Sequence, residues 1–273
     1  GRPVNAVRGL LDSIARLVEQ YQPNRLACAW DNDWRPAWRV ELVPSYKAHR
    51  VESGDVELVP SDLVAQVPLI TEVLAALGLP VVGADDCEAD DVIGTLARRA
   101  RLPVDVVTGD RDLFQLVDDD RQVRVLSVVK GVRNHERVTD EVLRQRYGID
   151  GAGYADFATL RGDASDGLPG VSGIGEKTAA SLLATFGSLA GIQDALASGD
   201  PRIKGAVRAR LEAGTAYLQV APAVVRVAVD APVPDLPTAV PTRVADPVLL
   251  SRLAVDYGLT NPFNRVIAAL GLD

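Results

Sequence analysis

Short apolar segments alternate with amphipathic segments through roughly the first 128 residues, and this alternation constrains the fold more than any other feature. The apolar residues of the first amphipathic segment recur at helical spacing: Val7, Leu10, Leu11, Ile14, Leu17 and Val18. The expected helices span residues 1–22, 61–78 and 88–101, and the expected strands span residues 25–30, 79–82 and 104–108. Strands that alternate with helices predict an α/β fold with a mostly parallel sheet.

The remaining segments depart from this alternation. Residues 32–60 contain three prolines and mix basic with aromatic residues, which predicts an irregular segment of the kind that often carries function. After residue 139 the pattern becomes helical, with glycine-rich turns at 162–175. Residues 221–247 are rich in proline and valine, which predicts an extended segment, and residues 246–270 predict a final helical region.

The composition excludes several classes of protein. Apolar residues make up 47% of the 273, enough for a sizeable core, yet no apolar run approaches the roughly 20 residues that span a membrane. The start of the sequence shows no signal-peptide pattern. Cys28 and Cys87, like His49 and His135, have no metal-type spacing, so a zinc site or histidine catalysis is not expected. We therefore expect a cytoplasmic protein with buried thiols.

The net charge of −8 at first argues against a nucleic-acid partner, because most such proteins carry a basic surface. The distribution of the acids matters more than their sum. Eight of the 37 acidic residues fall in short motifs that can serve one metal centre, and the remaining 29 equal the 29 basic residues. A chain of this kind can present a basic face beside an acidic pit.

Carboxylates stand at the ends of two expected strands. Asp31 ends the strand 25–30, and Asp110 follows the strand 104–108. The carboxyl ends of strands in an open α/β sheet line the binding crevice, so these acids can converge although they are distant in sequence. Asp112 lies two residues beyond Asp110, so in extended chain both side chains face the same way. Taken alone, Asp31 can equally be a strand-end surface acid.

Two further acidic clusters repeat a spacing of three residues. Glu88 and Asp91 open the helix 88–101 and share a helix face, and Asp163 and Asp166 stand in a segment flanked by glycines. Acids at a helix start also favour the macrodipole and cap free N–H groups, and we favour that explanation for residues 88–91 taken alone. The glycine–aspartate steps can be simple turns. Four such clusters together favour a shared metal centre.

The chemistry of such a centre follows from its ligands. Oxygen-only ligands suit Mg²⁺ or Mn²⁺ and do not suit zinc. Gathered carboxylates repel one another, so they persist best around cations. Two ions about 4 Å apart can clamp the attacking and leaving oxygens of a phosphodiester, which predicts a metal-dependent hydrolase.

The segment 168–179, Leu-Pro-Gly-Val-Ser-Gly-Ile-Gly-Glu-Lys-Thr-Ala, is the most specific motif. Gly173 and Gly175 allow close backbone approach, and the helix that begins near Glu176 aims its N–H groups at whatever binds there. Lys177 adds positive charge. The geometry predicts a phosphate site, and the alternative is a helix–turn–helix with a structural glycine turn.

This motif, preceded by Asp163-Ala164-Ser165-Asp166, resembles the 5′-nuclease family, which includes flap endonucleases and the 5′-nuclease domain of bacterial DNA polymerase I. The resemblance extends in the expected order over nearly the whole chain, through residues 88–93, residues 108–113 and Asp31. It implies a PIN-like, Rossmann-like α/β core with a mostly parallel sheet, a helical arch and a helix–three-turn–helix DNA-binding subdomain. It further implies a nuclease core at 1–150 that includes the arch at 32–60, a DNA-binding subdomain at 151–240, and a C-terminal segment at 241–273 packed on the core.

The resemblance also implies roles for individual residues. One metal site is implied for Asp31, Glu88, Asp90 and Asp91, and a second for Asp110, Asp112, Asp163 and Asp166. Duplex phosphates are implied at Gly173, Gly175, Lys177 and Thr178, with a K⁺ ion held through backbone oxygens of Val171, Ser172 and Ile174. The basic and aromatic arch positions, which would contact the scissile phosphate or stack on a base, are Arg39, Tyr46, Lys47 and Arg50. The alternative for the arch residues is a solvated basic loop, which we favour for Arg35.

Two departures from the family pattern stand out. The family begins with a strand that carries an early aspartate ligand, and this sequence starts after that point, at Gly1-Arg2-Pro3. We expect that a preceding segment carries this aspartate. Gly167 stands where relatives usually have Asn, and we expect this to change the detail of a turn more than metal binding.

The expected protein is a monomeric 5′-3′ exonuclease or flap endonuclease that uses two or more Mg²⁺ or Mn²⁺ ions. Its expected partner is DNA with 5′ flaps or 5′ ends, and no membrane is involved. Three alternatives remain open at this point: a PIN-like ribonuclease, a non-catalytic DNA-binding module if the early aspartate is absent, and, least favoured, a structural scaffold with incidental acids.

Overall fold

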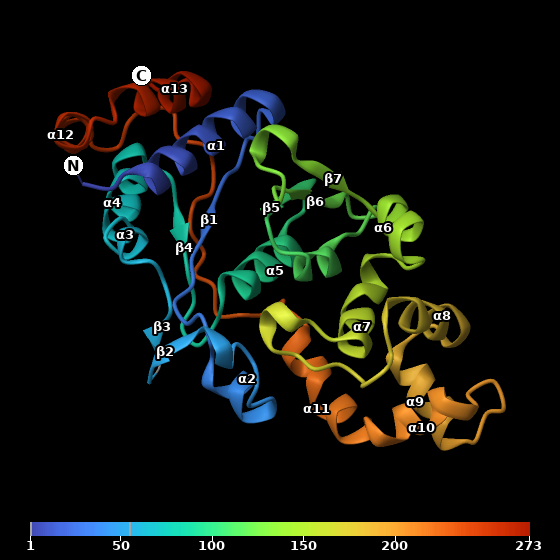
Figure 1. The fold of residues 1–273 in the computed structure, drawn as a ribbon. Helices are drawn as coiled ribbons and strands as arrows, with labels where there is room; N and C mark the ends of the chain where they lie inside the picture. Colours follow the sequence, from blue (N-terminus) through green and yellow to red (C-terminus); the bar gives the residue numbers. More distant parts are fainter. Residues whose placement is uncertain (1, 55) are drawn as a thin grey trace.

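A computed structural model describes residues 2–54 and 56–273; Gly1, in the expected first helix, and Asp55, in the segment 32–60, lie outside it. Its strands form two small sheets and a hairpin (Figure 1). In one sheet β1 (Cys28–Ala29) runs parallel to β4 (Val81–Val82). In the other, β5 (Val104–Thr108) runs parallel to β6 (Val123–Ser127), and β7 (Glu136–Val138) is antiparallel to β6. The expected α/β class is confirmed, but the strand expected at 25–30 pairs regularly over only two residues.

Helices surround these sheets. In the first half of the chain they are α1 (Asn5–Tyr21), α2 (Ala37–Leu42), α3 (Ser61–Val64), α4 (Val67–Leu77) and α5 (Ala89–Arg99). In the second half they are α6 (Asp140–Tyr147), α7 (Gly151–Arg161), α8 (Glu176–Phe186), α9 (Leu189–Ala197), α10 (Gly205–Ala213), α11 (Thr215–Val225), α12 (Pro247–Tyr257) and α13 (Thr260–Leu270). Short 3₁₀ turns are η1 (Ala48–Arg50), η2 (Asp112–Leu116), η3 (Val132–Asn134) and η4 (Ala164–Asp166). Among the described residues no helix is long and apolar enough to cross a membrane.

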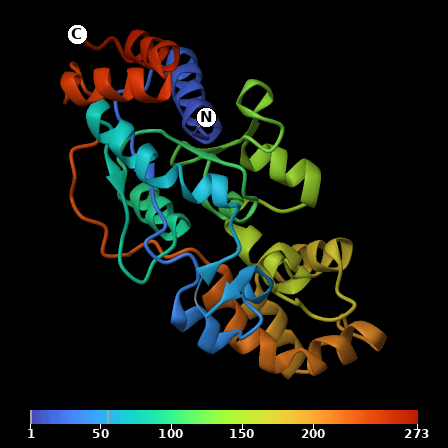
Figure 2. The same ribbon diagram turned by 60° about the vertical axis from the view of Figure 1, so that its left-hand side comes forward.

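Helix α1 shows how the apolar pattern determines packing. Its buried residues include Val7, Leu11 and Val18, which lie on one face, and the helix ends where Gln22 takes a left-handed conformation before Pro23. This face packs against α13, and α4 and α12 complete the same core. Figures 1 and 2 both place α12 and α13 beside α1, at the end of the molecule opposite α8–α10.

A second core joins the β5–β6–β7 sheet to the helices that follow it. It extends from Val106 and Val125 through Tyr154 and Phe157 of α7 to Leu218 of α11. The aromatic rings of Phe114, Tyr154 and Phe157 pack edge-on or tilted against one another within it. Because α7 is buried along most of its length, the segments before and after it are held in fixed positions relative to the sheet.

The segment 32–60 is more regular than expected. It contains α2, the turn η1 and an antiparallel hairpin of β2 (Val51–Ser53) and β3 (Val56–Glu57). The helix expected at 61–78 is divided into α3 and α4 near Gln66. The side chain of Gln66 accepts a hydrogen bond from the backbone N–H of Ala6 (2.8 Å), so the break supplies a cap for α1.

The extended segment expected from residue 221 begins later, because α11 continues to Val225 with Pro222 inside it. Proline has no N–H, so the carbonyl one turn earlier, that of Leu218, loses its helical donor. The side-chain amide of Gln193 lies 3.4 Å from this carbonyl and donates to it instead. The final helical region is confirmed as α12 and α13.

Candidate metal centre and phosphate-binding hairpin

Three acids of the candidate centre follow strands. Asp31 comes two residues after β1, and its Oδ1 accepts a hydrogen bond from the backbone N–H of Ala89 (2.7 Å), at the start of α5. Asp110 follows β5, and its Oδ1 accepts from the backbone N–H of Asp112 (2.9 Å). Asp112 therefore begins the turn η2 instead of continuing in an extended chain. The strand-end acids are thus tied to the neighbouring turn and helix start.

The start of α5 supplies two more acids to the centre. Glu88 is the N-cap residue of α5 and forms a reciprocal capping box with Asp91. Asp90 lies between them in the first turn and is half-buried. The capping explanation and the functional one are therefore compatible at residues 88–91, because Asp91 caps the helix while its neighbour faces the other acids.

The glycine-flanked acids lie at the two ends of η4, where Asp163 is the N-cap residue and Asp166 the last residue. Asp163 is buried, and its Oδ1 accepts from the backbone N–H of Ser165 (2.8 Å). Asp166 is buried and accepts from the guanidinium of Arg50 (2.8 Å). Gly167 has φ +67°, and a Cβ there would lie 2.2 Å from the backbone oxygen of Ser45. A side chain at 167 therefore requires the segment around Ser45 to move, which goes beyond the change in turn detail that we expected.

Seven acids from these segments form one electrostatic group, called the carboxylate cluster below: Asp31, Glu88, Asp90, Asp110, Asp112, Asp163 and Asp166. Burial, together with repulsion from neighbouring carboxylates, raises the pKa of Asp90 to about 7 and that of Asp112 to about 8. The repelling neighbours of Asp90 include Asp110 and Asp31, and those of Asp112 include Asp110, Asp166 and Asp163. Asp110 repels both, so it links the acids of the two implied ligand sets.

The cluster fits divalent cations by its chemistry. The Oδ1 atom of Asp112 is buried without a hydrogen-bond partner, and such an atom costs free energy unless something pairs with it. All of the donor atoms are carboxylate oxygens, the ligands that Mg²⁺ and Mn²⁺ prefer. As the side chains stand, no three acidic, histidine or cysteine groups within residues 2–54 and 56–273 are close enough to hold one ion. An ion would have to draw the mutually repelling carboxylates closer together.

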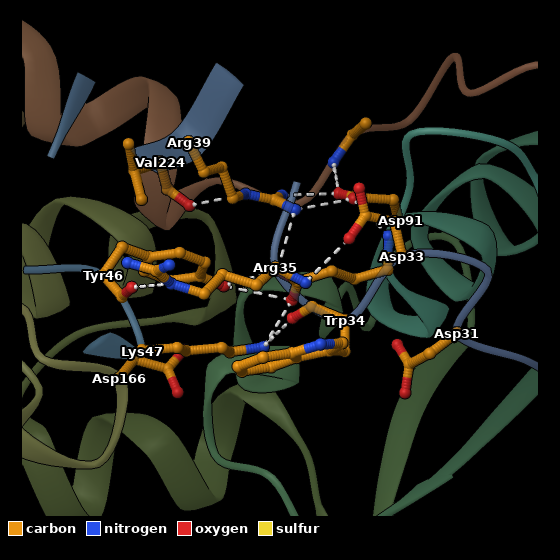
Figure 3. Close-up of polar contacts among 12 residues, drawn as sticks. Asp31, Asp33, Trp34, Arg35, Arg39, Tyr46, Lys47, Asp91, Asp166 and Val224 are labelled. Carbon is orange, nitrogen blue, oxygen red and sulfur yellow. Dashed lines mark hydrogen bonds and ion pairs between the residues drawn. The ribbon is translucent and has the colours of Figure 1, made fainter. Parts of the chain in front are cut away.

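Asp91 does not belong to the cluster, which corrects its assignment as a metal ligand. Its oxygens accept from both terminal nitrogens of Arg39 (2.7 and 2.8 Å) and from the backbone N–H groups of Ala228 (2.7 Å) and Glu88 (3.1 Å). Figure 3 shows this pairing of Arg39 with Asp91, while Asp31 lies apart from it. Four donors occupy the carboxylate, and these hydrogen bonds with Arg39 hold the pKa of Asp91 below its usual value despite burial. Asp91 is therefore a structural anion.

Arg39 and Tyr46 also differ from their expected roles. Arg39 is only 2% exposed and donates to the carbonyl of Val224 in α11 as well as to Asp91, so it is not available to a phosphate. Tyr46 is 3% exposed and donates its hydroxyl to Glu88 (2.8 Å), so its ring is not free to stack on a base. Both residues position the acids at the start of α5. Arg35 is not a solvated residue either, since its Nε donates to the carbonyl of Tyr46 (2.7 Å; Figure 3).

Lys47 and Arg50 bring positive charge directly to the cluster. The Nζ of Lys47 lies 2.7 Å from Oε2 of Glu88 and 3.2 Å from the carbonyl of Trp34. Burial lowers the pKa of Lys47, but Glu88 and Asp166 more than offset this, so the net shift is upward and the ammonium stays charged. Arg50 pairs with Asp166 and is half-exposed. Both cations come from the segment 32–60.

The glycine-rich hairpin combines buried anchors with an exposed turn. Val171 and Ile174 are buried in the second core, whereas Ser172, Gly173 and Gly175 are exposed. Gly173 has φ +77°, which favours glycine, and Gly175 is the N-cap residue of α8 with open space around it. Lys177 is exposed and Thr178 is half-buried on the first turn of α8. This arrangement presents backbone and a helix N-terminus to solvent.

Sequence reasoning missed three arginines near these elements. Arg111 and Arg161 lie 3.8 and 3.3 Å from Asp163, and Arg210 of α10 donates to the carbonyl of Gly173 (2.9 Å). Arg111 stands between two acids of a recognised motif, and Arg161 directly precedes Gly162-Asp163. Their positions beside acidic motifs could have indicated from sequence that both arginines lie near the site. Arg210 has no such signal, because it is 37 residues from Gly173 in the chain.

The fold as a whole is that of known nucleases. The chain superposes on T5 5′-exonuclease, determined with bound zinc, with a TM-score of 0.62 at 17% identity, covering 99% of this chain and 90% of that one. It superposes on the catalytic core of Rad2 in complex with DNA substrate with a TM-score of 0.60 at 19% identity, covering 97% and 83%. These likenesses define the class of fold: a PIN-like α/β domain followed by a helical domain.

The sequence then identifies the family. Residues 1–148 match the N-terminal resolvase-like domain of the 5′-3′ exonucleases, and residues 149–247 match their C-terminal SAM fold. The chain belongs to the 5′-3′ exonuclease family. It is 57% identical over 275 residues to a 5′-3′ exonuclease of Streptomyces coelicolor, covering 99% of this chain and 91% of that protein. The corresponding figures for a 5′-3′ exonuclease of Mycobacterium tuberculosis are 49% over 284 residues, covering 99% and 89%.

A further relative is much longer. DNA polymerase I of Mycobacterium tuberculosis is 41% identical over 214 residues, which cover 77% of this chain but only 23% of that protein. The match is therefore to a part of the polymerase.

Proposed function

We propose that this protein hydrolyses DNA phosphodiester bonds near single-strand/double-strand junctions, as a divalent-metal-dependent 5′-3′ exonuclease and flap endonuclease of DNA replication and repair. The observation that carries the proposal is the carboxylate cluster, which gathers acids from four separate segments beside two cations of the segment 32–60. The names of the relatives support the same activity.

The residues that would hold Mg²⁺ or Mn²⁺ are those of the carboxylate cluster. Asp31, Glu88 and Asp90 would hold one ion, and Asp110, Asp112, Asp163 and Asp166 would hold the second. Such ions, when bound, generate the attacking hydroxide and neutralise charge on the phosphate. Asp91, Arg39 and Tyr46 fix the start of α5, so that Glu88 and Asp90 are presented in a constant position.

Lys47 and Arg50 supply the positive charge that acts on the scissile phosphate. Each is paired with a cluster acid, Lys47 with Glu88 and Arg50 with Asp166, so each lies beside the acids that would hold the ions. A pre-positioned cation stabilises the charge that develops on phosphate oxygens during attack. The buried stem of Lys47 restricts its motion and lowers the entropy cost of this contact.

The hairpin would hold the duplex on the far side of the cut. The backbone at Gly173 and Gly175, with Lys177 and Thr178, offers donors to the phosphates, and the carbonyls of Val171, Ser172 and Ile174 offer a K⁺ site. We propose that the nuclease core spans residues 1–150, the DNA-binding subdomain 151–240 and the C-terminal segment 241–273. We further propose that the protein acts as a monomer on DNA with 5′ flaps or 5′ ends.

The test uses Asp110→Asn and Asp163→Asn on matched flap substrates of DNA and RNA, with Mg²⁺ or Mn²⁺. Both variants should bind flap DNA with a Kd close to wild type and should cut it at least about 100-fold more slowly. Asp256→Asn, on the exposed face of α12, is the control and should cut normally.

Normal cutting by Asp110→Asn would remove the metal-centre assignment. Faster cutting of the RNA flap than of the DNA flap by the wild-type protein would replace DNA by RNA as the substrate. Isothermal titration with Mn²⁺ in the absence of nucleic acid gives an independent measure, and Asp110→Asn should lose at least one bound ion.

A further inference from the structure

A surface cavity of about 670 Å³ lies beside the carboxylate cluster, and neither the metal centre nor the hairpin accounts for it. Two arginines line it, Arg111 from the turn before η2 and Arg161 from the last turn of α7. The rest of the lining comes from the segment 162–169 and from Glu176 at the start of α8.

The structural contacts of Arg111 do not explain its presence, and those of Arg161 do not use all of its donors. The Arg111 side chain is 52% exposed, and its nearest carboxylate oxygen, on Asp163, is 3.8 Å away. An exposed ion pair at that distance contributes little to stability. Arg161 lies over the ring of Phe157 and donates to the carbonyl of Gly162 (3.0 Å) and to Asp163 (3.3 Å). This leaves Arg161 part of its guanidinium for another partner, since the group carries five N–H donors.

The position of the cavity suggests what it binds. It shares Asp163 with the carboxylate cluster and Glu176 with the helix that follows the hairpin. A DNA strand that is held at the hairpin and cut at the cluster would therefore pass close to it. Guanidinium groups match phosphate in charge and in bidentate hydrogen-bond geometry, which lysine does not.

We propose that Arg111 and Arg161 form a phosphate subsite, which rests on the proposed nuclease function and fixes the strand between the hairpin and the cut. The subsite takes one phosphate group of the DNA. That phosphate is either an internal phosphodiester or a terminal 5′-phosphate, and the two sources share the same chemistry.

The first experiment compares Arg111→Gln, Arg161→Gln and Arg161→Lys with wild type in cleavage of flap DNA over a range of salt concentrations. Each Gln variant should raise KM roughly tenfold with kcat little changed, because one charge-assisted phosphate contact is lost. In an Asp110→Asn background, the slope of log Kd against log salt concentration should fall by about one. Arg161→Lys keeps the charge without the planar fork, so it should fall between wild type and Arg161→Gln.

Arg252→Gln, on exposed α12 at the far end of the molecule, is the matched control and should leave KM and the salt slope unchanged. Thermal unfolding of each variant separates a folding defect in Arg161→Gln from a binding defect, and Arg111→Gln tests the subsite independently of it.

The second experiment locates the phosphate. In a series of substrates, one phosphate at a time is replaced by a neutral methylphosphonate, and one further substrate has a 5′-hydroxyl in place of the 5′-phosphate. One of these changes should weaken wild-type binding roughly tenfold and have no additional effect on Arg111→Gln. If the affected substrate carries an internal methylphosphonate, the subsite binds that phosphodiester. If the affected substrate is the one with the 5′-hydroxyl, the subsite binds the terminal 5′-phosphate.

The subsite would be overturned if both Gln variants kept the KM and the salt slope of wild type. It would also be overturned if every neutral phosphate replacement weakened binding by Arg111→Gln as much as it weakened binding by wild type. If the wild-type protein neither binds nor cuts flap DNA, the proposed function fails instead, and the two failures are thereby distinguished.

Discussion

Two adjacent residues, Asp90 and Asp91, lie in opposite electrostatic environments. Asp91 accepts four hydrogen bonds, two of them from Arg39, and its pKa is lowered. Asp90 lies among other carboxylates, and burial together with their repulsion raises its pKa to about 7. One helix start thus supplies one acid that is fully paired and another that is repelled by the acids around it.

The difference separates acids that stabilise the fold from acids kept for a ligand. A buried carboxylate with its full set of donors costs little once folded, but removing its partners is expensive. Carboxylates that repel one another, as Asp90 and Asp112 are repelled by their neighbours, destabilise the metal-free protein and gain most from a cation. The two kinds of acid differ in the number and the charge of the groups around each carboxylate. Their position in the sequence motif does not distinguish them.

The largest effect is expected at Asp90 and Asp112. Asp90→Asn and Asp112→Asn should each slow flap cleavage by at least about 100-fold, since a neutral amide binds cations weakly in place of a carboxylate. Neither should lower the thermal stability of the metal-free protein, because each removes a repelled charge. Single-turnover cleavage and thermal unfolding measure the two effects. Cleavage within threefold of the wild-type rate by both variants would show that Asp90 and Asp112 are not needed to bind the ions.

Asp91→Asn should act in the opposite sense. It leaves the buried Arg39 guanidinium without its anion, and we expect a loss of about 3–5 kcal/mol in the free energy of unfolding. Denaturant unfolding measures this loss, and Arg39→Met combined with Asp91→Leu should recover part of it. A stable Asp91→Asn protein that no longer binds Mn²⁺ would instead make Asp91 a ligand.

Stability of the metal-free protein should depend on pH. Asp90 and Asp112 have pKa values of about 7 and about 8 in the folded chain, against 3.8 as the ordinary value. Between pH 4 and pH 8 the folded chain therefore binds more protons than the unfolded chain, so this contribution to stability falls as the pH rises. Asp91, with its lowered pKa, loses stabilisation only below about pH 4 and does not offset this trend.

The measurement is the Tm in EDTA at pH 5.5 and at pH 8. Wild type should have the higher Tm at pH 5.5, and Asp112→Asn should show a smaller difference between the two conditions. Saturating Mg²⁺ should raise the Tm mainly at pH 8. If Asp112→Asn shows the same difference in Tm between pH 5.5 and pH 8 as wild type, the carboxylate cluster is not the cause of the pH dependence.

The smallest effect is expected at Lys47. Its ammonium lies 2.7 Å from Glu88, where it opposes a nearby cation, so Lys47→Met should tighten Mn²⁺ binding roughly threefold to tenfold in the absence of DNA. Isothermal titration gives the Kd directly. Lys177→Met, at an exposed position of α8, is the control and should bind Mn²⁺ as wild type does. Weaker Mn²⁺ binding by Lys47→Met would mean that Lys47 organises the ligands.

The sequence predicts the α/β class and the positions of the strand-end acids, because apolar periodicity and chain order are local properties. It also predicts α8 after the hairpin, since Gly175 and Glu176 together give a helix start. The fate of Asp91 is not local. It depends on the N–H of Ala228, 137 residues away, and on Arg39, which is itself held by the carbonyl of Val224.

The errors in the segment 32–60 have the same origin. Arg39 and Tyr46 look like exposed basic and aromatic residues in sequence, but α11 and the start of α5 bury them. Lys47 and Arg50, from the same segment, reach the cluster because the backbone of Lys47 donates to the carbonyl of Asp166 (2.9 Å). Only the tertiary contacts distinguish these two pairs.

The anomalous scattering of a crystal soaked in Mn²⁺ tests the account most directly. We expect manganese peaks coordinated by Asp110 and by other acids of the carboxylate cluster, among them Asp90 and Asp112, with Asp91 still paired to Arg39. Manganese bound by Asp91, or no manganese at the carboxylate cluster in crystals of a protein that cuts DNA, would contradict it.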